Sequence, residues 1–222
     1  MSDGIIYLVP GISGGIVGTW LQKRALIKAG CPYAVEIYDW SRGALRFVGD
    51  ITDVEGNREK ARALAKMIET WLDAHPGGRV QVLGVSGGAA VATWAIEELR
   101  PDVTIDRLML SAPALSSGYD LTRALRHVDR EAVVFVSRND LVLLGIGTWL
   151  FGALDRVKGF AAGKVGFALP GNADDETRRL YAKIRRIDWT PEMLREGNYG
   201  GHLGWSSPLF VRRRLVPMLV GD

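Results

Sequence analysis

Five short apolar runs, separated by segments with helical periodicity, constrain the fold of this chain more than any other feature of its sequence. The runs show little alternation of polar and apolar residues, which is typical of strands buried on both faces. They are Ile5–Val9, Ala34–Tyr38, Val80–Val85, Leu108–Leu110 and Val133–Val136, and a sixth candidate strand is Lys183–Trp189. The longest helical pattern covers residues 57–74, where apolar side chains recur at helical spacing behind a predicted N-cap, Asn57.

Strands that alternate with helices predict βαβ units with right-handed crossovers. We therefore expect an α/β fold, a three-layer sandwich around a mainly parallel sheet of about six strands. The 222 residues fit one domain, and a last helix is predicted at Pro208–Leu219. Residues 141–182, rich in glycine, are predicted to form either a small cap over the functional site or a long connection.

Composition places the chain among ordinary globular proteins. Hydrophobic residues make up 47% of the sequence and charged residues 24%, and the formal net charge is +3. This basic bias is weak, and a nucleic-acid or anionic-lipid footprint would need cations clustered on one surface. We therefore expect a solvated face and no nucleic-acid partner. The densest positive runs are Arg178, Arg179, Lys183, Arg185 and Arg186, and then Arg212–Arg214.

The N-terminal segment and the number of cysteines indicate where in the cell the protein is expected. The single cysteine, Cys31, allows no intramolecular disulfide and is compatible with a reducing cytoplasm. The start of the chain has no basic n-region, and Pro10 and Gly11 interrupt the first apolar run. We expect neither a signal peptide nor a transmembrane helix, and hence a cytoplasmic protein without stable membrane insertion. The oligomeric state is left open.

The strongest motif is Gly84, Val85, Ser86, Gly87, Gly88, which matches G-x-S-x-G between a strand and a helical pattern. A nucleophilic serine needs such a strained strand-to-helix turn with small neighbours, because the turn raises its hydroxyl above the sheet. A second match surrounds Ser13. A nucleophile also needs an oxyanion donor from the loop of an earlier strand, and only Ser86 has such a loop, residues 10–15. The predicted nucleophile is Ser86.

A serine hydroxyl becomes a good nucleophile only when a base removes its proton, and the chain has three histidines. His75 and His127 each end a predicted helix, where surface or helix-terminal roles are the better interpretation. His202 lies in a glycine-flanked loop between the last strand and the last helix. Because this place completes the chain order serine, acid, histidine, His202 is the predicted base.

Two aspartates compete for the role of the acid that orients the histidine. Asp140 comes just after the strand Val133–Val136, at the kind of strand end where catalytic groups collect in open α/β sheets. It would accept the Nδ1–H of the imidazole, although an aspartate here could also be a helix N-cap. Asp120 comes one strand earlier. We favour Asp140.

In motif and in the order of its landmarks, the chain resembles the α/β-hydrolase superfamily over nearly its whole length. The resemblance implies a reduced form of that fold. It also implies that the first strand's turn, at Gly11 and Ile12, and the residue after the nucleophile contribute backbone oxyanion donors. The implied oxyanion hole consists of the amides of Ile12 and Gly87. The family's frequent His-Gly dipeptide in the first turn is replaced by Pro10 and Gly11.

These residues predict a serine hydrolase that cleaves a carboxylic ester or related acyl bond through an acyl-enzyme, with a small-molecule acyl substrate and no cofactor. Scattered histidines offer no metal-ligand spacing, and the G-x-G-x-x-G spacing of dinucleotide sites is absent. Two alternatives stay open: an acyltransferase that uses the same triad, and a non-catalytic α/β-hydrolase-like binding protein. Apolar residues would suit an acyl chain or simply pack as a helix face; they are Leu143, Ile146, Trp149, Leu150 and Phe151.

Overall fold

The computed structural model describes residues 4–12, 16–43, 47–139, 154–157, 159–202 and 204–221. At its centre is a six-stranded sheet in which every neighbouring pair of strands is parallel, in the order β2-β1-β3-β4-β5-β6. The strands are β1 Gly4–Val9, β2 Ala34–Ile37, β3 Arg79–Val85, β4 Ile105–Ser111, β5 Val128–Val136 and β6 Ile184–Asp188. This architecture confirms the predicted three-layer α/β fold with a parallel sheet of six strands.

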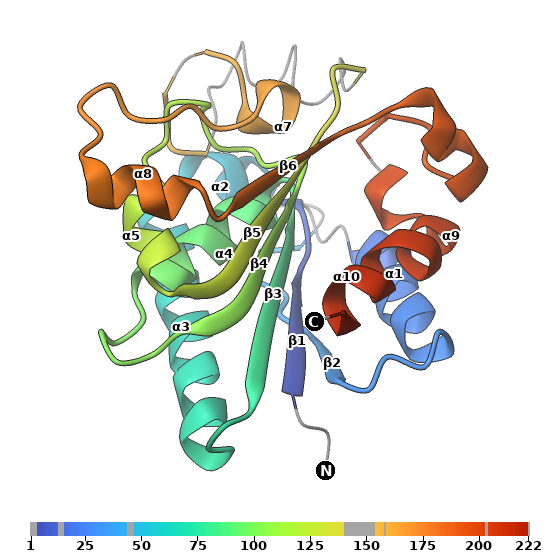
Figure 1. Cartoon of the computed structure of the whole chain (residues 1–222), viewed down its shortest axis with the longest axis horizontal. Coiled ribbons are helices and arrows are strands. Elements are labelled where there is room, and N and C mark those ends of the chain that lie inside the picture. The colour runs from blue at the N-terminus through green and yellow to red at the C-terminus, as the bar shows by residue number, and fades with distance from the viewer. Residues whose placement is uncertain are drawn as a thin grey trace.

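Helices cover both faces of the sheet (Figure 1). One layer contains α1 (Ile16–Lys28), α9 (Pro208–Phe210) and α10 (Val216–Val220). The other contains α3 (Val54–Ala74), α4 (Gly87–Glu97), α5 (Thr122–Arg126) and α8 (Asp175–Tyr181). Because both faces are covered, the core is continuous, and its largest fully buried side chains include Trp40, Trp94, Trp205, Phe135 and Phe210.

The central strands are buried as predicted, and the outer ones are not. Nearly all residues of β1, β3 and β4 are buried, as are the last five of β5. The expectation that the second run is also buried on both faces is wrong, because β2 is an edge strand with Glu36 exposed. At the opposite edge, β6 exposes Arg185 and Arg186.

Helix α3 begins three residues before the predicted start. The side chain of Asp53 caps it by accepting a 2.9 Å hydrogen bond from the N–H of Gly56. Asn57, the predicted cap, lies inside the first turns, is buried and donates through Nδ2 to the carbonyl of Asp50 at 2.7 Å. It therefore fastens α3 to the short helix α2 (Phe47–Thr52) instead of capping it.

The predicted last helix is present, with an irregularity. It runs as α9, a π-helical turn at Val211–Leu215, and α10. Pro217 has no N–H to donate to the preceding turn, which accounts for a departure from regular α-helical bonding at this point.

Part of the long connection lies against the loop that follows β4. Leu154 donates to the carbonyl of Ala114 at 2.8 Å, and Ala162, the first residue of α7 (Ala162–Val165), donates to that of Leu115 at 2.8 Å. Gly163 in turn accepts from the N–H of Ser137, just beyond β5, at 2.9 Å. The described residues between 154 and 165 therefore lie beyond the carboxyl ends of β4 and β5, where α7 is seen in Figure 1. Two short 3₁₀ helices follow β6, at Pro191–Glu196 and Gly204–Ser206.

Candidate active site

The strand order reverses direction at β1. The chain passes from β1 to β2 on one side and then returns to β3 on the other, so β1 and β3 are neighbours that lead to opposite halves of the sheet. In open α/β sheets, ligands bind beyond the carboxyl ends of the strands at such a switch point. Here these two ends carry residues 10–12 and Ser86. The strongest sequence motif therefore lies at the position that topology favours for a site.

Ser86 has a strained backbone. Its φ of 55° and ψ of −120° are rare for a residue with a side chain, and such a conformation costs on the order of 1–3 kcal/mol. The surrounding backbone holds it in place. Its N–H donates to the carbonyl of Ser111 at 2.9 Å, and its carbonyl accepts from Ala89 at 3.0 Å and Ala114 at 3.2 Å. Ser86 thus lies in a sharp strand-to-helix turn, as the G-x-S-x-G motif predicts, and it is partly exposed.

The glycines of the motif are required by close packing. A Cβ on Gly84 would lie 2.6 Å from the Cα of Ala89, and one on Gly88 would collide with the carbonyl oxygens of Val9 and Pro10. Neither position has room for a side chain, since real Cβ contacts are essentially never this short. The turn can therefore pack α4 against the end of β1 only with glycine at both places.

The loop after β1 lies beside the turn. A Cβ on Gly11 would be 3.4 Å from the Cβ of Ser86 and 4.0 Å from its Oγ, and one on Gly87 would be 2.7 Å from Cγ2 of Ile12. The structure thus brings the two predicted oxyanion-hole residues, Ile12 and Gly87, together next to Ser86. Gly87 is the first residue of α4, where N–H groups have no intrahelical acceptor. Backbone N–H groups of this kind can stabilise a developing oxyanion.

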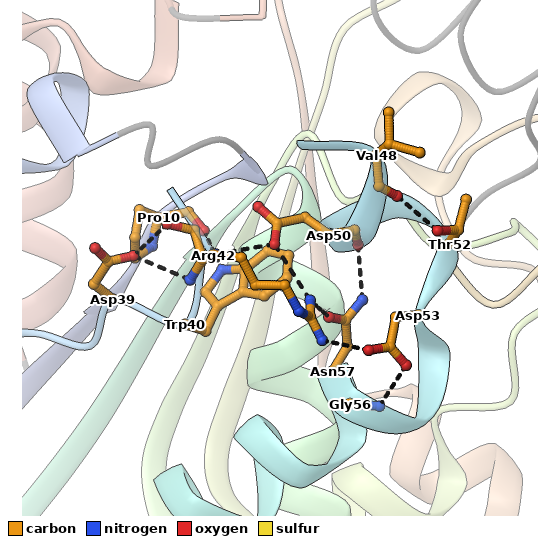
Figure 2. A network of polar contacts seen from close by, with 11 residues as sticks. Pro10, Asp39, Trp40, Arg42, Val48, Asp50, Thr52, Asp53, Gly56 and Asn57 are labelled. Carbon is orange, nitrogen blue, oxygen red and sulfur yellow. Dashed lines mark hydrogen bonds and ion pairs between the residues drawn. The ribbon is translucent and has the colours of Figure 1, made fainter. Parts of the chain in front are cut away.

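Trp40 supports this arrangement, and sequence reasoning missed it. Its side chain is fully buried, and its Nε1–H donates to the carbonyl of Pro10 at 2.7 Å (Figure 2). The ring also packs on the turn, since a Cβ on Gly87 would be 3.2 Å from its Cζ2. One side chain therefore contacts both the β1 loop and the turn that carries Ser86. No motif signals this contact, because Trp40 follows a different strand.

A polar network holds the segment that carries Trp40 (Figure 2). The guanidinium of Arg42 lies 3.3 Å from Oδ1 of Asp50 and 2.7 Å from Oδ2 of Asp53, and it donates to Asn57 at 2.9 Å. Asp50 is completely buried, and burying a carboxylate is costly unless it is paired and hydrogen-bonded. The network therefore ties the β2–α2 connection to the start of α3 and limits the movement of Trp40.

His202 lies in the loop after β6, on the side of the sheet where the carboxyl ends of the strands and Ser86 lie. The hydroxyl of Ser137, just beyond β5, donates to the carbonyl of Gly200. Gly200 has a φ of 78°, and a Cβ there would lie 2.7 Å from the Trp189 ring, so this turn requires glycine. Asn198 closes the loop by accepting from Gly200 N–H at 2.9 Å. The histidine is partly buried, two residues after the contact with Ser137.

The predicted acid, Asp140, lies outside the described residues, as do Ser13 and the apolar candidates between residues 143 and 151. The rival acid is described. Oδ1 of Asp120 accepts hydrogen bonds from the N–H of Thr122 at 2.9 Å and from its hydroxyl at 2.5 Å. Asp120 is exposed and stabilises the start of α5, which is a sufficient local role for this carboxylate.

The other two histidines lie away from Ser86. His75 ends α3, where its ring stacks on Trp71 at 4.3 Å and its Nδ1 is 2.8 Å from the carbonyl of that residue. His127 directly precedes β5, with Nδ1 2.8 Å from the carbonyl of Val103. His127 therefore lies at the amino ends of the parallel strands, whereas Ser86 lies at their carboxyl ends. The helix-terminal interpretation of both histidines agrees with these contacts.

Comparison with known proteins adds no family. The sequence matches no family model and no curated protein. Among the described residues, no cluster of three or more His, Cys, Asp or Glu side chains could hold a metal ion, and no helix is long and apolar enough to cross a membrane. The geometry around Ser86 is therefore the main indication of function.

Proposed function

We propose that the chain is a serine hydrolase of the α/β-hydrolase type, which cleaves a carboxylic ester or related acyl bond through an acyl-enzyme on Ser86. The observation that carries the proposal is the backbone of Ser86, with φ 55° and ψ −120° between a buried strand and a helix. A conformation that costs free energy persists where the surroundings enforce it, and such positions cluster at active sites. The neighbouring Gly11 and Gly87 support the same interpretation.

In the proposed mechanism His202 accepts the proton of the Ser86 hydroxyl as the oxygen attacks the acyl carbon. The carbonyl oxygen of the substrate gains negative charge, which the N–H groups of Ile12 and Gly87 stabilise. Asp140 accepts the Nδ1–H of His202, holds the imidazole tautomer and stabilises the imidazolium. His202 then protonates the leaving group. In the second step His202 takes a proton from water, which attacks the acyl carbon, so that the bond to Ser86 Oγ breaks, Ser86 regains a proton from His202 and the carboxylic acid leaves.

A fluorophosphonate probe tests the nucleophile. We expect the probe to label Ser86, so that Ser86→Ala is not labelled while Ser13→Ala is labelled as the unchanged protein. His202→Ala should be labelled far more slowly than the unchanged protein, and His75→Ala and His127→Ala should be labelled at the normal rate. Peptide mapping that located the label on Ser13, or no labelling of the folded protein, would contradict the proposal.

A panel of chromogenic esters with different acyl chain lengths tests the reaction. Hydrolysis by the unchanged protein and its loss in Ser86→Ala are the expected results. Labelling of Ser86 without turnover of any ester in water, but with transfer of the acyl group to an added alcohol or amine, would identify an acyltransferase and refute hydrolysis.

A further inference from the structure

Helix α1 (Ile16–Lys28) turns its large apolar side chains outward. Val17 is 71% exposed, Trp20 50% and Ile27 58%, and Leu21 is exposed as well. These positions recur at intervals of three or four residues, so they share one side of the helix with Arg24 and Lys28. The guanidinium of Arg24 lies 5.3 Å from the centre of the Trp20 ring. The exposed side of α1 is therefore apolar and cationic.

The buried side of α1 packs Ala25 and Leu26 into the core and also includes small and polar residues. Thr19 and Gln22 are buried, and Nε2 of Gln22 donates to the carbonyl of Trp205 at 3.4 Å. Gly18 faces Ser206, since a Cβ there would lie 3.6 Å from the Cβ of that serine. A helix that packs on a core normally buries its apolar side. In α1 the largest side chain, Trp20, lies outside instead, which indicates a surface adapted to a partner.

The charged residues of α1 itself are all cationic. Helix α1 contains Lys23, Arg24 and Lys28 and no acidic residue. Within the described part of the chain, none of these three cations is paired with a carboxylate. The π-helical turn, which contacts α1, also has exposed cations, Arg212 and Arg213, of which Arg213 donates to the carbonyl of Arg195 at 2.7 Å. In Figure 1 these helices form the outer layer on one side of the sheet. A complementary partner is therefore anionic.

We propose that the exposed side of α1, formed by Val17, Trp20, Leu21, Arg24, Ile27 and Lys28, docks on the surface of an anionic lipid bilayer. A tryptophan among aliphatic residues with flanking cations is the composition of helices that lie in the membrane interface. A second copy of this chain would bring like charges together, and a nucleic acid would leave the apolar side chains in water. The docking is peripheral and does not require catalysis.

Vesicle sedimentation tests the proposal with the full chain. We expect binding to vesicles of phosphatidylcholine mixed with phosphatidylglycerol, little binding to phosphatidylcholine alone, and weaker binding at high salt. Trp20→Gln should lower the affinity about tenfold, and Trp20→Phe should restore most of it. Changing Arg24 and Lys28 together to Gln should lower affinity about 25-fold, roughly fivefold for each cation.

Matched variants on the opposite layer serve as controls. Arg178 and Arg179 are exposed on α8, and changing both to Gln should leave vesicle binding unchanged, as should Leu169→Gln. Ser86→Ala should bind as the unchanged protein does, which separates docking from the proposed hydrolysis. Circular dichroism and thermal melts verify that each variant is folded.

Three results would overturn the proposal. The first is no binding to the anionic vesicles, and the second is equal loss of binding in the α1 and α8 variants. The third is a dimer in analytical ultracentrifugation that Trp20→Gln dissociates, because a second copy would then cover this surface.

Discussion

The hydroxyl of Ser137 joins the exit of β5 to the histidine loop by donating a hydrogen bond to the carbonyl of Gly200. Ser137 lies three residues before Asp140 in the chain, and Gly200 lies two residues before His202. The contact therefore connects the two segments that carry the proposed acid and base. We infer that Ser137 positions the histidine loop.

Ser137→Ala should accordingly impair catalysis more than folding. Losing this bond should cost about 1–3 kcal/mol of stability, because the Gly200 carbonyl loses its buried donor. Turnover of an acyl ester should fall roughly tenfold with little change in KM, since misplaced catalytic groups slow the chemical step. Steady-state kinetics and urea unfolding measure both effects.

Ser111 provides a matched control for that variant. It ends β4, is equally buried, and its Oγ has no hydrogen-bond partner among the described residues. Ser111→Ala should leave both stability and turnover near those of the unchanged protein. Equal losses of stability and turnover in Ser137→Ala and Ser111→Ala would mean that a serine at the carboxyl end of a strand contributes through packing and not through the bond to Gly200.

The choice between two acids can be tested by isosteric substitution. Asp140→Asn should lower turnover by up to ~10⁴-fold, because an asparagine favours the wrong tautomer of His202. Asp120→Asn should keep nearly full activity, since Asp120 already serves the start of α5 through Thr122. If the two variants behaved in the opposite way, the acid would follow β4 instead of β5.

Trp40 should affect the transition state more than the substrate complex. Trp40→Phe keeps an aromatic ring in the core but removes the donor to the Pro10 carbonyl and the outer indole atoms beside Gly87, so the loop with the Ile12 amide loses its orientation. We expect kcat to fall about tenfold with KM nearly unchanged, as for loss of an interaction made only in the transition state. Affinity for a boronic acid that mimics the tetrahedral state should fall with kcat.

Trp71→Phe is the comparison for this change. Trp71 stacks on His75 at the end of α3, remote from the carboxyl edge of the sheet. Its substitution should alter stability only. A parallel fall of kcat in both variants would show a general effect of lost indole packing.

These residues also show how far sequence patterns reach. Five apolar runs and the candidate 183–189 predict the six strands of the described structure to within five residues, with the largest error at the start of β5, because buried parallel strands leave a continuous apolar signal. The turn at Ser86 is likewise predicted, since three glycines and the serine fall within the five residues 84–88. Trp40 and Pro10 are 30 residues apart, and nothing in their local sequence announces the contact. No pattern predicts helix α1, because apolar side chains lie on its exposed side (Val17, Trp20, Ile27) as well as on its buried side, which weakens the helical periodicity.

Glu97 predicts a pH dependence of stability. Burial raises the pKa of its carboxyl above the ordinary value, although the hydrogen bond from Tyr119 and the charge of Arg58 oppose the shift. The folded protein therefore holds this proton more tightly than the unfolded chain does. The stability it contributes is fully present below the ordinary pKa of 4.5 and is lost as the pH rises through the raised pKa.

Glu97→Gln cannot ionise and still offers an oxygen to Tyr119. The unfolding free energy of the unchanged protein, relative to this variant, should fall as the pH rises above 4.5, at most ~1.4 kcal/mol per pH unit for one proton. Glu192 is a control of opposite sign. The hydroxyl of Thr190 lowers the pKa of Glu192, so its contribution is present above the ordinary pKa and is lost as the pH falls. Urea unfolding at a series of pH values measures how the unfolding free energy depends on these two carboxyl groups. If the difference between the unchanged protein and Glu97→Gln did not vary with pH, the prediction for Glu97 would be wrong.

The strained backbone of Ser86 makes a prediction that does not depend on catalysis. Glycine adopts a φ of 55° without the clash that a Cβ causes, whereas alanine retains that clash. We therefore expect Ser86→Gly to unfold with a free energy about 1 kcal/mol higher than Ser86→Ala, even though glycine loses more entropy on folding. In the regular part of α4 the same exchange, Ala90→Gly, should destabilise by about 1 kcal/mol. Urea unfolding of the three variants decides the matter. If glycine were as unfavourable at position 86 as at position 90, no strain would be stored in the turn, and the main support for a nucleophilic serine there would be lost.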